Sequence, residues 1–76
     1  MEDKIISLLE DIHPGVDFAK EQHLIDNRIL DSFDVVSLAT ELMDEFDIQI
    51  TAEHLVPENF NTTAAIAALV EKLQEE

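Results

Sequence analysis

The stretch that decides the fold is RILDSFDVVSLATELMDEFD, residues 28–47. Its apolar residues recur at intervals of three and four, the spacing of one buried helical stripe: Val35, Leu38, Ala39, Leu42 and Phe46. Asp31 is suited to cap the N-terminus of this helix, and Asp34 lies three residues later, where a short acid can complete a capping box. The pattern therefore predicts a helix that begins after Asp31 and runs to about Phe46.

Helical periodicity also predicts a helix near each end of the chain. From Glu2 to Ile12 apolar residues recur at helical spacing. His13-Pro14-Gly15 ends this helix, because Pro removes a backbone donor and Gly tolerates a left-handed conformation. Towards the C-terminus, Asn61 or Thr62 can cap a last helix. The three helices are expected to supply the core: Ile5, Leu8, Leu9, Ile12, Leu38, Leu42, Phe46, Ile66, Leu69 and Val70.

The segments between these helices have less regular patterns. Residues 16–31 have no sustained period, but their scattered apolar side chains indicate a loop that lies over the helices and closes the core. Ile48 and Ile50 alternate with polar neighbours as in a short extended link, residues 51–54 can form a single turn, and Pro57 suits the start of a short helix, PENF. We therefore predict an all-α fold, a small four-helix bundle with three main helices, one short helix and a long first loop, in a single domain over residues 1–76.

The charge balance excludes several classes of partner. Eighteen acidic and four basic residues give a formal net charge of −14, which is unsuited to binding nucleic acid or anionic lipid and favours proteins with basic surfaces. Since 46% of the residues are hydrophobic, we expect the chain to fold rather than remain a disordered acidic tail. No stretch is long enough to span a bilayer, and the N-terminus lacks a signal-peptide pattern, so a cytoplasmic monomer is expected.

No catalytic or metal site is predicted. The chain has no Cys, which rules out disulfides and thiolate ligands. His13, His23 and His54 are far apart in the sequence and lack the spacing of a zinc site. The Gly-x-Ser-x-Gly elbow of many serine hydrolases and the glycine-centred loop of an EF-hand are both missing. We therefore do not expect an enzyme.

A second set of side chains lies on the other side of the helix predicted after Asp31. Helical geometry places five residues roughly opposite the buried stripe: Phe33, Val36, Ser37, Thr40 and Asp44. Acids surround them, and no Lys, Arg or His occurs between Asp31 and Asp47. Two interpretations remain open. Phe33 packs under the long loop and the acids are an ordinary solvated face, or the apolar residues and the acids together form a docking surface for proteins.

Ser32 lies in the first turn of this helix, where a chemical modification would be well placed. Free backbone N–H groups and the helix dipole favour a negative group at that position. A phosphodiester on the Ser32 hydroxyl would therefore be electrostatically favourable. An unmodified Ser is also common at a helix start, so these arguments alone leave both interpretations open.

Three short sequences together resemble the carrier-protein family, which includes acyl carrier proteins, peptidyl carrier proteins and the D-alanyl carrier of teichoic acid synthesis. They are LDSF at residues 30–33, EFD at residues 45–47 and PENFNT at residues 57–62. The resemblance extends over essentially the whole chain, because the order of helices, the long first loop and the total length are also similar. It implies the helical bundle of acyl carrier type.

The resemblance implies that the Ser32 hydroxyl is esterified with 4′-phosphopantetheine from coenzyme A by a separate, magnesium-dependent phosphopantetheinyl transferase. The thiol of this covalent cofactor would carry acyl or aminoacyl groups as thioesters, while partner enzymes supply the catalysis. The turn at residues 58–60 would flank the arm. By position, the residues implied in recognition by the transferase and by other partner enzymes are Asp31, Phe33, Asp34, Val36, Thr40, Met43, Asp44 and Glu45.

Two questions of function stay open at this point. Phe33 occupies a position where many fatty acid carriers have Leu, and DSF and ENFNT are similar to carriers of the D-alanyl type. The cargo could therefore belong to fatty acid biosynthesis, to D-alanyl modification of teichoic acid or to another acyl pathway. The rival from a different class is an acidic helical interaction module without a prosthetic group. Ser32→Ala would abolish the function of a carrier and leave that of an interaction module unchanged.

Overall fold

Four α-helices follow one another in the predicted order in a computed structural model that describes residues 1–75. Their bounds are Glu2–Ile12 for α1, Ser32–Phe46 for α2, Pro57–Phe60 for α3 and Thr63–Gln74 for α4, with a 3₁₀ turn, η1, at Ala52–His54. These bounds confirm the three main helices, the single turn and the short PENF helix. The described residues contain no strand, in agreement with the all-α prediction.

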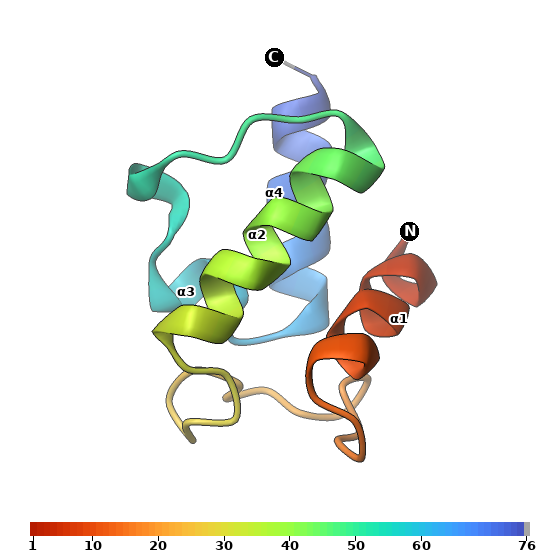
Figure 1. Cartoon of the computed structure of the whole chain (residues 1–76), viewed down its shortest axis with the longest axis vertical. Coiled ribbons are helices and arrows are strands. Elements are labelled where there is room, and N and C mark those ends of the chain that lie inside the picture. Colours follow the sequence, from red (N-terminus) through yellow and green to blue (C-terminus); the bar gives the residue numbers. More distant parts are fainter. Residues whose placement is uncertain (76) are drawn as a thin grey trace.

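The helices are arranged around one core, with α2 crossing in front of α4 and α1 beside them (Figure 1). α1 contacts both α2 and α4, and α3 contacts α4. The loop of residues 13–31 passes beneath one end of the helices (Figure 1). The radius of gyration of the Cα atoms is 11.1 Å, close to the value of about 11 Å expected for a compact chain of this length. Among residues 1–75, none of the helices has the length and apolar character needed to traverse a lipid bilayer.

The predicted core is mostly confirmed, with three corrections. The expected residues that are buried are Ile5, Leu9, Leu38, Leu42, Ile66, Leu69 and Val70. Leu8, Ile12 and Phe46 are only partly buried and pack against the edge of the core. Ile12 and Phe46 end α1 and α2, where fewer neighbouring elements cover a side chain, and Leu8 lies beside the stripe formed by Ile5 and Leu9.

Side chains from outside the three main helices complete the core: Phe18, Leu24, Leu30, Ile48, Ile50 and Phe60. Three of them belong to the first loop, which confirms that this loop packs over the helices. The buried hydroxyl of Thr63 donates a hydrogen bond to the carbonyl of Phe18 at 2.9 Å and so fastens the loop to α4. Because this loop contributes buried apolar side chains to the core, it is a packed part of the fold and not a simple connection between two helices.

The last two helices begin as the sequence predicts. Pro57 is the first residue of α3, where its missing N–H costs no helical hydrogen bond. Of the two candidate caps for α4, Thr62 is the one used, because its hydroxyl accepts a hydrogen bond from the Ala65 N–H at 2.9 Å. The Asn61 side chain instead accepts hydrogen bonds from the first loop.

Asp47, the residue that follows the last residue of α2, has a backbone conformation that suits Gly better than Asp. Its φ of 53° is left-handed, and its negative charge lies at the C-terminal end of the helix dipole. We expect Asp47→Gly to increase the free energy of unfolding by about 1 kcal/mol and Asp47→Asn, which removes only the charge, by about 0.3–1 kcal/mol. Urea unfolding followed by far-UV circular dichroism would measure both. A decrease for both variants would show that the Asp47 side chain stabilises the fold.

Candidate functional site

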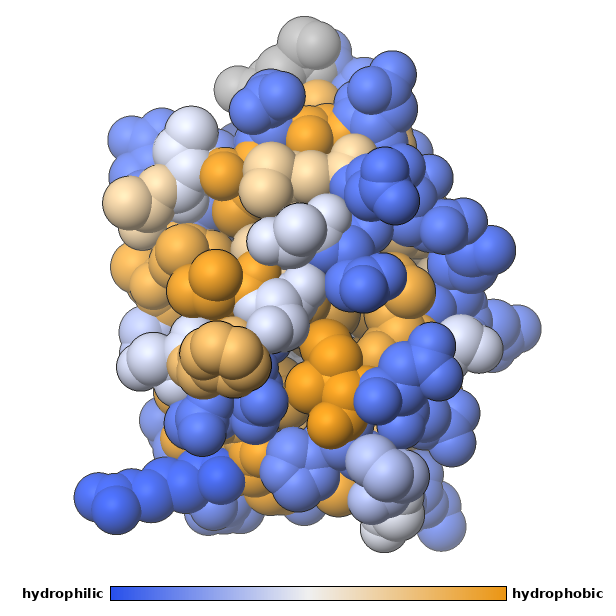
Figure 2. Space-filling view, in the orientation of Figure 1, coloured by the Kyte–Doolittle hydropathy of each residue, from blue (hydrophilic) through white to orange (hydrophobic). Residues whose placement is uncertain are grey.

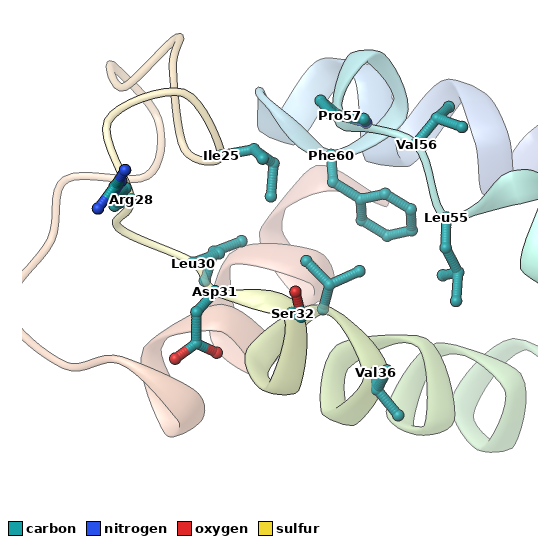
Figure 3. A pocket seen from close by; sticks show the side chains of 11 residues that line it. Ile25, Arg28, Leu30, Asp31, Ser32, Val36, Leu55, Val56, Pro57 and Phe60 are labelled. Atoms are coloured by element: carbon teal, nitrogen blue, oxygen red, sulfur yellow. The ribbon is translucent and has the colours of Figure 1, made fainter.

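Ser32 is the first residue of α2, and it lies beside a cavity. Ser32 is exposed, and its hydroxyl oxygen is on the side of α2 that faces Phe60 and Leu55 (Figure 3). The cavity has a volume of about 450 Å³. Its walls comprise Ile25, Arg28, Leu30 and Asp31 from the first loop, Ser32, Val35 and Val36 from α2, and Leu55, Val56, Pro57 and Phe60 from the segment that includes α3. Because most of these side chains are apolar, the cavity can hold an apolar group close to the hydroxyl.

The backbone at Ser32 is ordered by the two acids beside it. Asp31 Oδ1 accepts a hydrogen bond from the Asp34 N–H at 2.8 Å, and Asp34 Oδ2 accepts one from the Asp31 N–H at 3.4 Å. These bonds confirm the predicted capping box and do not use the Ser32 hydroxyl. The first N–H groups of a helix have no intrahelical acceptors, so a negative group attached to Ser32 Oγ would be stabilised there.

The outer α2 face, defined by Phe33, Val36, Thr40 and Asp44, presents apolar and polar side chains together. Phe33 is 77% exposed and Val36 is 53% exposed, so the interpretation in which Phe33 packs under the long loop is wrong. Thr40 and Asp44 are exposed as well. In the view of Figure 2, hydrophobic side chains gather over α2 and the segment leading to α3, and hydrophilic side chains border them. A surface of this kind is suited to a partner that offers apolar contacts inside a basic rim.

Two residues that the sequence assigned to partner recognition lie outside this face. Met43 is partly buried and packs against the core. The carboxylate of Glu45 forms an ion pair with Lys4 of α1, with Nζ and Oε1 2.8 Å apart. Both residues therefore have contacts within the fold, because helical geometry turns them to opposite flanks of the outer α2 face. Their part in recognition stays a prediction.

Asn61 joins the first loop to the end of α3, which no sequence pattern indicated. Its Oδ1 accepts hydrogen bonds from the N–H groups of Ile25 at 2.9 Å and Asp26 at 3.1 Å. Its Nδ2 donates to Asp26 Oδ2 at 3.4 Å, and its backbone carbonyl accepts from the Leu24 N–H at 2.9 Å. We call these four bonds the Asn61 latch. The latch fixes the loop wall of the cavity, to which Ile25 contributes, relative to the wall formed by α3.

The Asn61 latch should have a measurable effect on stability. Asn61→Ala removes the acceptor of the Ile25 and Asp26 N–H groups, and Ile25 is partly buried, so we expect a loss of about 1–3 kcal/mol in the free energy of unfolding. Asn27→Ala in the same loop is the matched control, because the Asn27 side chain makes only an exposed 3.5 Å bond to Glu21. Equal urea midpoints for the two variants would contradict the role of the latch.

Comparison with known proteins gives a match along the full length of the chain. The sequence is 30% identical over 78 residues to the D-alanyl carrier protein of Lactococcus lactis subsp. lactis (strain IL1403), covering 100% of this chain and 99% of the relative. No family model matches the sequence, and no solved structure matches it. Since the match spans both chains almost completely, it includes the first loop, the helix that begins at Ser32 and the segment around α3 together.

Proposed function

Because the chain belongs to the acyl carrier protein family, we propose that it carries acyl groups as thioesters on a 4′-phosphopantetheine arm attached to Ser32 Oγ. The observation that supports Ser32 most directly is its exposed hydroxyl at the start of α2, beside a largely apolar cavity of about 450 Å³. The residues present fit the group. The helix start favours its phosphate, and the cavity offers room for an apolar chain close to the point of attachment.

Attachment of the arm is a substitution at phosphorus in which Ser32 supplies the nucleophile. Ser32 Oγ forms a bond to the phosphorus that carries the pantetheine of coenzyme A, and the bond from that phosphorus to the bridging oxygen breaks. Adenosine 3′,5′-bisphosphate leaves with the electron pair, and the hydroxyl proton passes to a base of the transferase. Asp31 and Asp34 hold the helix start in place and are the acids proposed for recognition by the transferase.

Partner enzymes are proposed to dock on the outer α2 face. Phe33 and Val36 would provide the apolar contacts, and Asp44 and the acids around it would steer basic surfaces into register. Phe33 is the strongest candidate for an anchor, since an aromatic side chain that is 77% exposed has a large area to bury in a partner. Met43 and Glu45 would contribute at the flanks.

For the cargo, the cavity favours an apolar acyl chain. Each CH₂ group that leaves water for the cavity would stabilise the loaded protein by up to about 0.8 kcal/mol. The ammonium group of a D-alanyl thioester would have to lose its hydration to enter the same space, so such a cargo would remain outside. D-alanine is the second candidate, because the similar protein of Lactococcus lactis is a D-alanyl carrier protein.

The first experiment is intact-protein mass spectrometry after incubation with coenzyme A, Mg²⁺ and a broad-specificity phosphopantetheinyl transferase. Addition of a single phosphopantetheine would support the carrier. Absence of any addition, in protein shown to be folded and tested with more than one transferase, would favour an interaction module that docks through the outer α2 face.

The cargo can then be compared on the modified protein. Octanoyl and D-alanyl thioesters would be prepared on the arm, and their urea midpoints compared with that of the unloaded form. If the cavity holds apolar cargo, the octanoyl form should have a higher urea midpoint than the unloaded form, and the D-alanyl form should have the same midpoint as the unloaded form. Equal midpoints for all three forms would contradict the argument from the cavity and leave D-alanine, supported by the relative, as the better candidate.

A further inference from the structure

Arg28 lies four residues before Ser32, and its backbone has an unfavourable conformation that hydrogen bonds within the turn maintain. Its φ of 59° lies in the left-handed region, which residues other than Gly rarely adopt. Two hydrogen bonds hold the turn: the Arg28 N–H donates to the Ile25 carbonyl at 3.0 Å, and the Leu30 N–H donates to the Leu24 carbonyl at 2.9 Å. Strained residues of this kind occur where the surrounding structure determines the conformation, often at ligand sites.

The Asn61 latch anchors the same turn. Asn61 bonds the backbone of Leu24, Ile25 and Asp26, which lie two to four residues before Arg28. The position of the Arg28 backbone relative to α3 and to the start of α2 is therefore determined by contacts on both sides of the turn, while its side chain is exposed. Figure 3 shows Arg28 on the loop that leads through Leu30 and Asp31 into α2, with its guanidinium on the side of the loop away from Ser32.

Arg28 is also the single basic residue among those that line the cavity. The chain has 18 acidic residues, yet none of the carboxylates in residues 1–75 forms an ion pair with the Arg28 guanidinium. Asp31, which is near it in sequence, directs its carboxylate to the Asp34 N–H instead. The Arg28 side chain is exposed, lines the same cavity as Ser32 and has no carboxylate partner among residues 1–75, so rotation about its side-chain bonds can bring the guanidinium to an anion attached there.

We propose that Arg28 contacts the phosphodiester of the group attached to Ser32, an inference that rests on the proposed function. A guanidinium presents N–H donors in a planar fork that matches two phosphate oxygens. The N–H groups at the start of α2 would approach the same phosphate from the helix side. The contact also offsets the repulsion between the phosphate and the carboxylates of Asp31 and Asp34. In a chain of net charge −14, few other positive groups could offset this repulsion.

The test compares the stability of each protein with and without the arm. Wild type, Arg28→Gln, Arg28→Lys and Lys20→Gln are unfolded in urea before and after attachment of phosphopantetheine, at low salt. Both substitutions keep a long side chain at the left-handed position. Arg28→Gln removes the positive charge and the guanidinium, whereas Arg28→Lys keeps the charge and removes only the planar set of N–H donors. Lys20→Gln is the matched control, because Lys20 is an exposed cation of the same loop that does not line the cavity. Far-UV circular dichroism is suitable, since the chain has no Trp or Tyr.

The expected result is a coupling between the arm and Arg28. For each protein, the measured quantity is the ratio of the folding equilibrium constant with the arm to that without it. This ratio should be about two- to five-fold larger for wild type and Lys20→Gln than for Arg28→Gln, and Arg28→Lys should give an intermediate value. The difference should disappear near 1 M salt. Phosphorus NMR should show a salt-sensitive shift of the phosphodiester signal in wild type that is lost in Arg28→Gln.

Other outcomes would overturn the proposal in distinguishable ways. If all four proteins accept the arm and respond to it equally, Arg28 does not contact the phosphate, and the carrier function is unaffected. If Arg28→Gln only slows attachment, with unchanged coupling and phosphorus signal, Arg28 contacts the transferase instead. If wild type itself accepts no arm, the proposed function fails, and the role of Arg28 fails with it.

Discussion

Ser32→Ala is expected to abolish attachment of phosphopantetheine and to leave the fold intact. The substitution removes the oxygen that would form the phosphodiester, and no neighbouring side chain can replace it at that position. The start of α2 is capped by Asp31 and Asp34, so the loss of the Ser32 hydroxyl leaves the capping box in place. Mass spectrometry after incubation with coenzyme A and a transferase would show the unmodified mass, and the far-UV circular dichroism spectrum would match that of wild type.

Ser7→Ala is the control for this experiment. Ser7 is exposed on α1, and its loss should leave attachment unchanged. Phosphopantetheine on Ser32→Ala would refute Ser32 as the attachment site. Full biological activity of Ser32→Ala, combined with loss of activity in Phe33→Ala, would instead identify a module that acts only through the outer α2 face.

Leu42→Ala is expected to reduce the free energy of unfolding by about 2–5 kcal/mol. Leu42 is 0% exposed in the middle of α2, the helix that contacts both α1 and α4, so truncation leaves a cavity between the main helices. A chain of this length has a total stability of roughly 4–11 kcal/mol, so the variant would be largely unfolded if wild type lies near the lower limit. Urea unfolding followed by circular dichroism would measure the loss.

Phe33→Ala on the same helix is the matched control. Because Phe33 is 77% exposed, its truncation should change the stability by no more than about 0.5 kcal/mol. The same variant should weaken binding to partner enzymes, so that stability and recognition separate on one helix. A loss below about 2 kcal/mol for Leu42→Ala would mean that the neighbouring side chains collapse into the space it leaves.

The sequence alone determined the features that depend on local interactions. The helices α1, α2 and α4 follow from apolar residues at intervals of three and four, since one face of each helix has to be buried. The capping box of Asp31 and Asp34 depends on residues only three apart. The position of Phe33 opposite the buried stripe also follows from helical spacing, whereas the structure decided that the long loop does not cover it.

Only the tertiary structure decided the features that depend on contacts between distant parts of the chain. The burial of Phe18 and Leu24 has no periodic signal, because an irregular loop can direct a side chain to either side. Asn61 was one of two alternative caps predicted for α4, whereas in the fold its side chain accepts a hydrogen bond from the N–H of Asp26, 35 residues away. The cavity beside Ser32 is likewise formed by the first loop, α2 and the segment around α3, which meet only after packing. Local patterns therefore predicted where the helices are, and packing between distant segments determined what surrounds the serine.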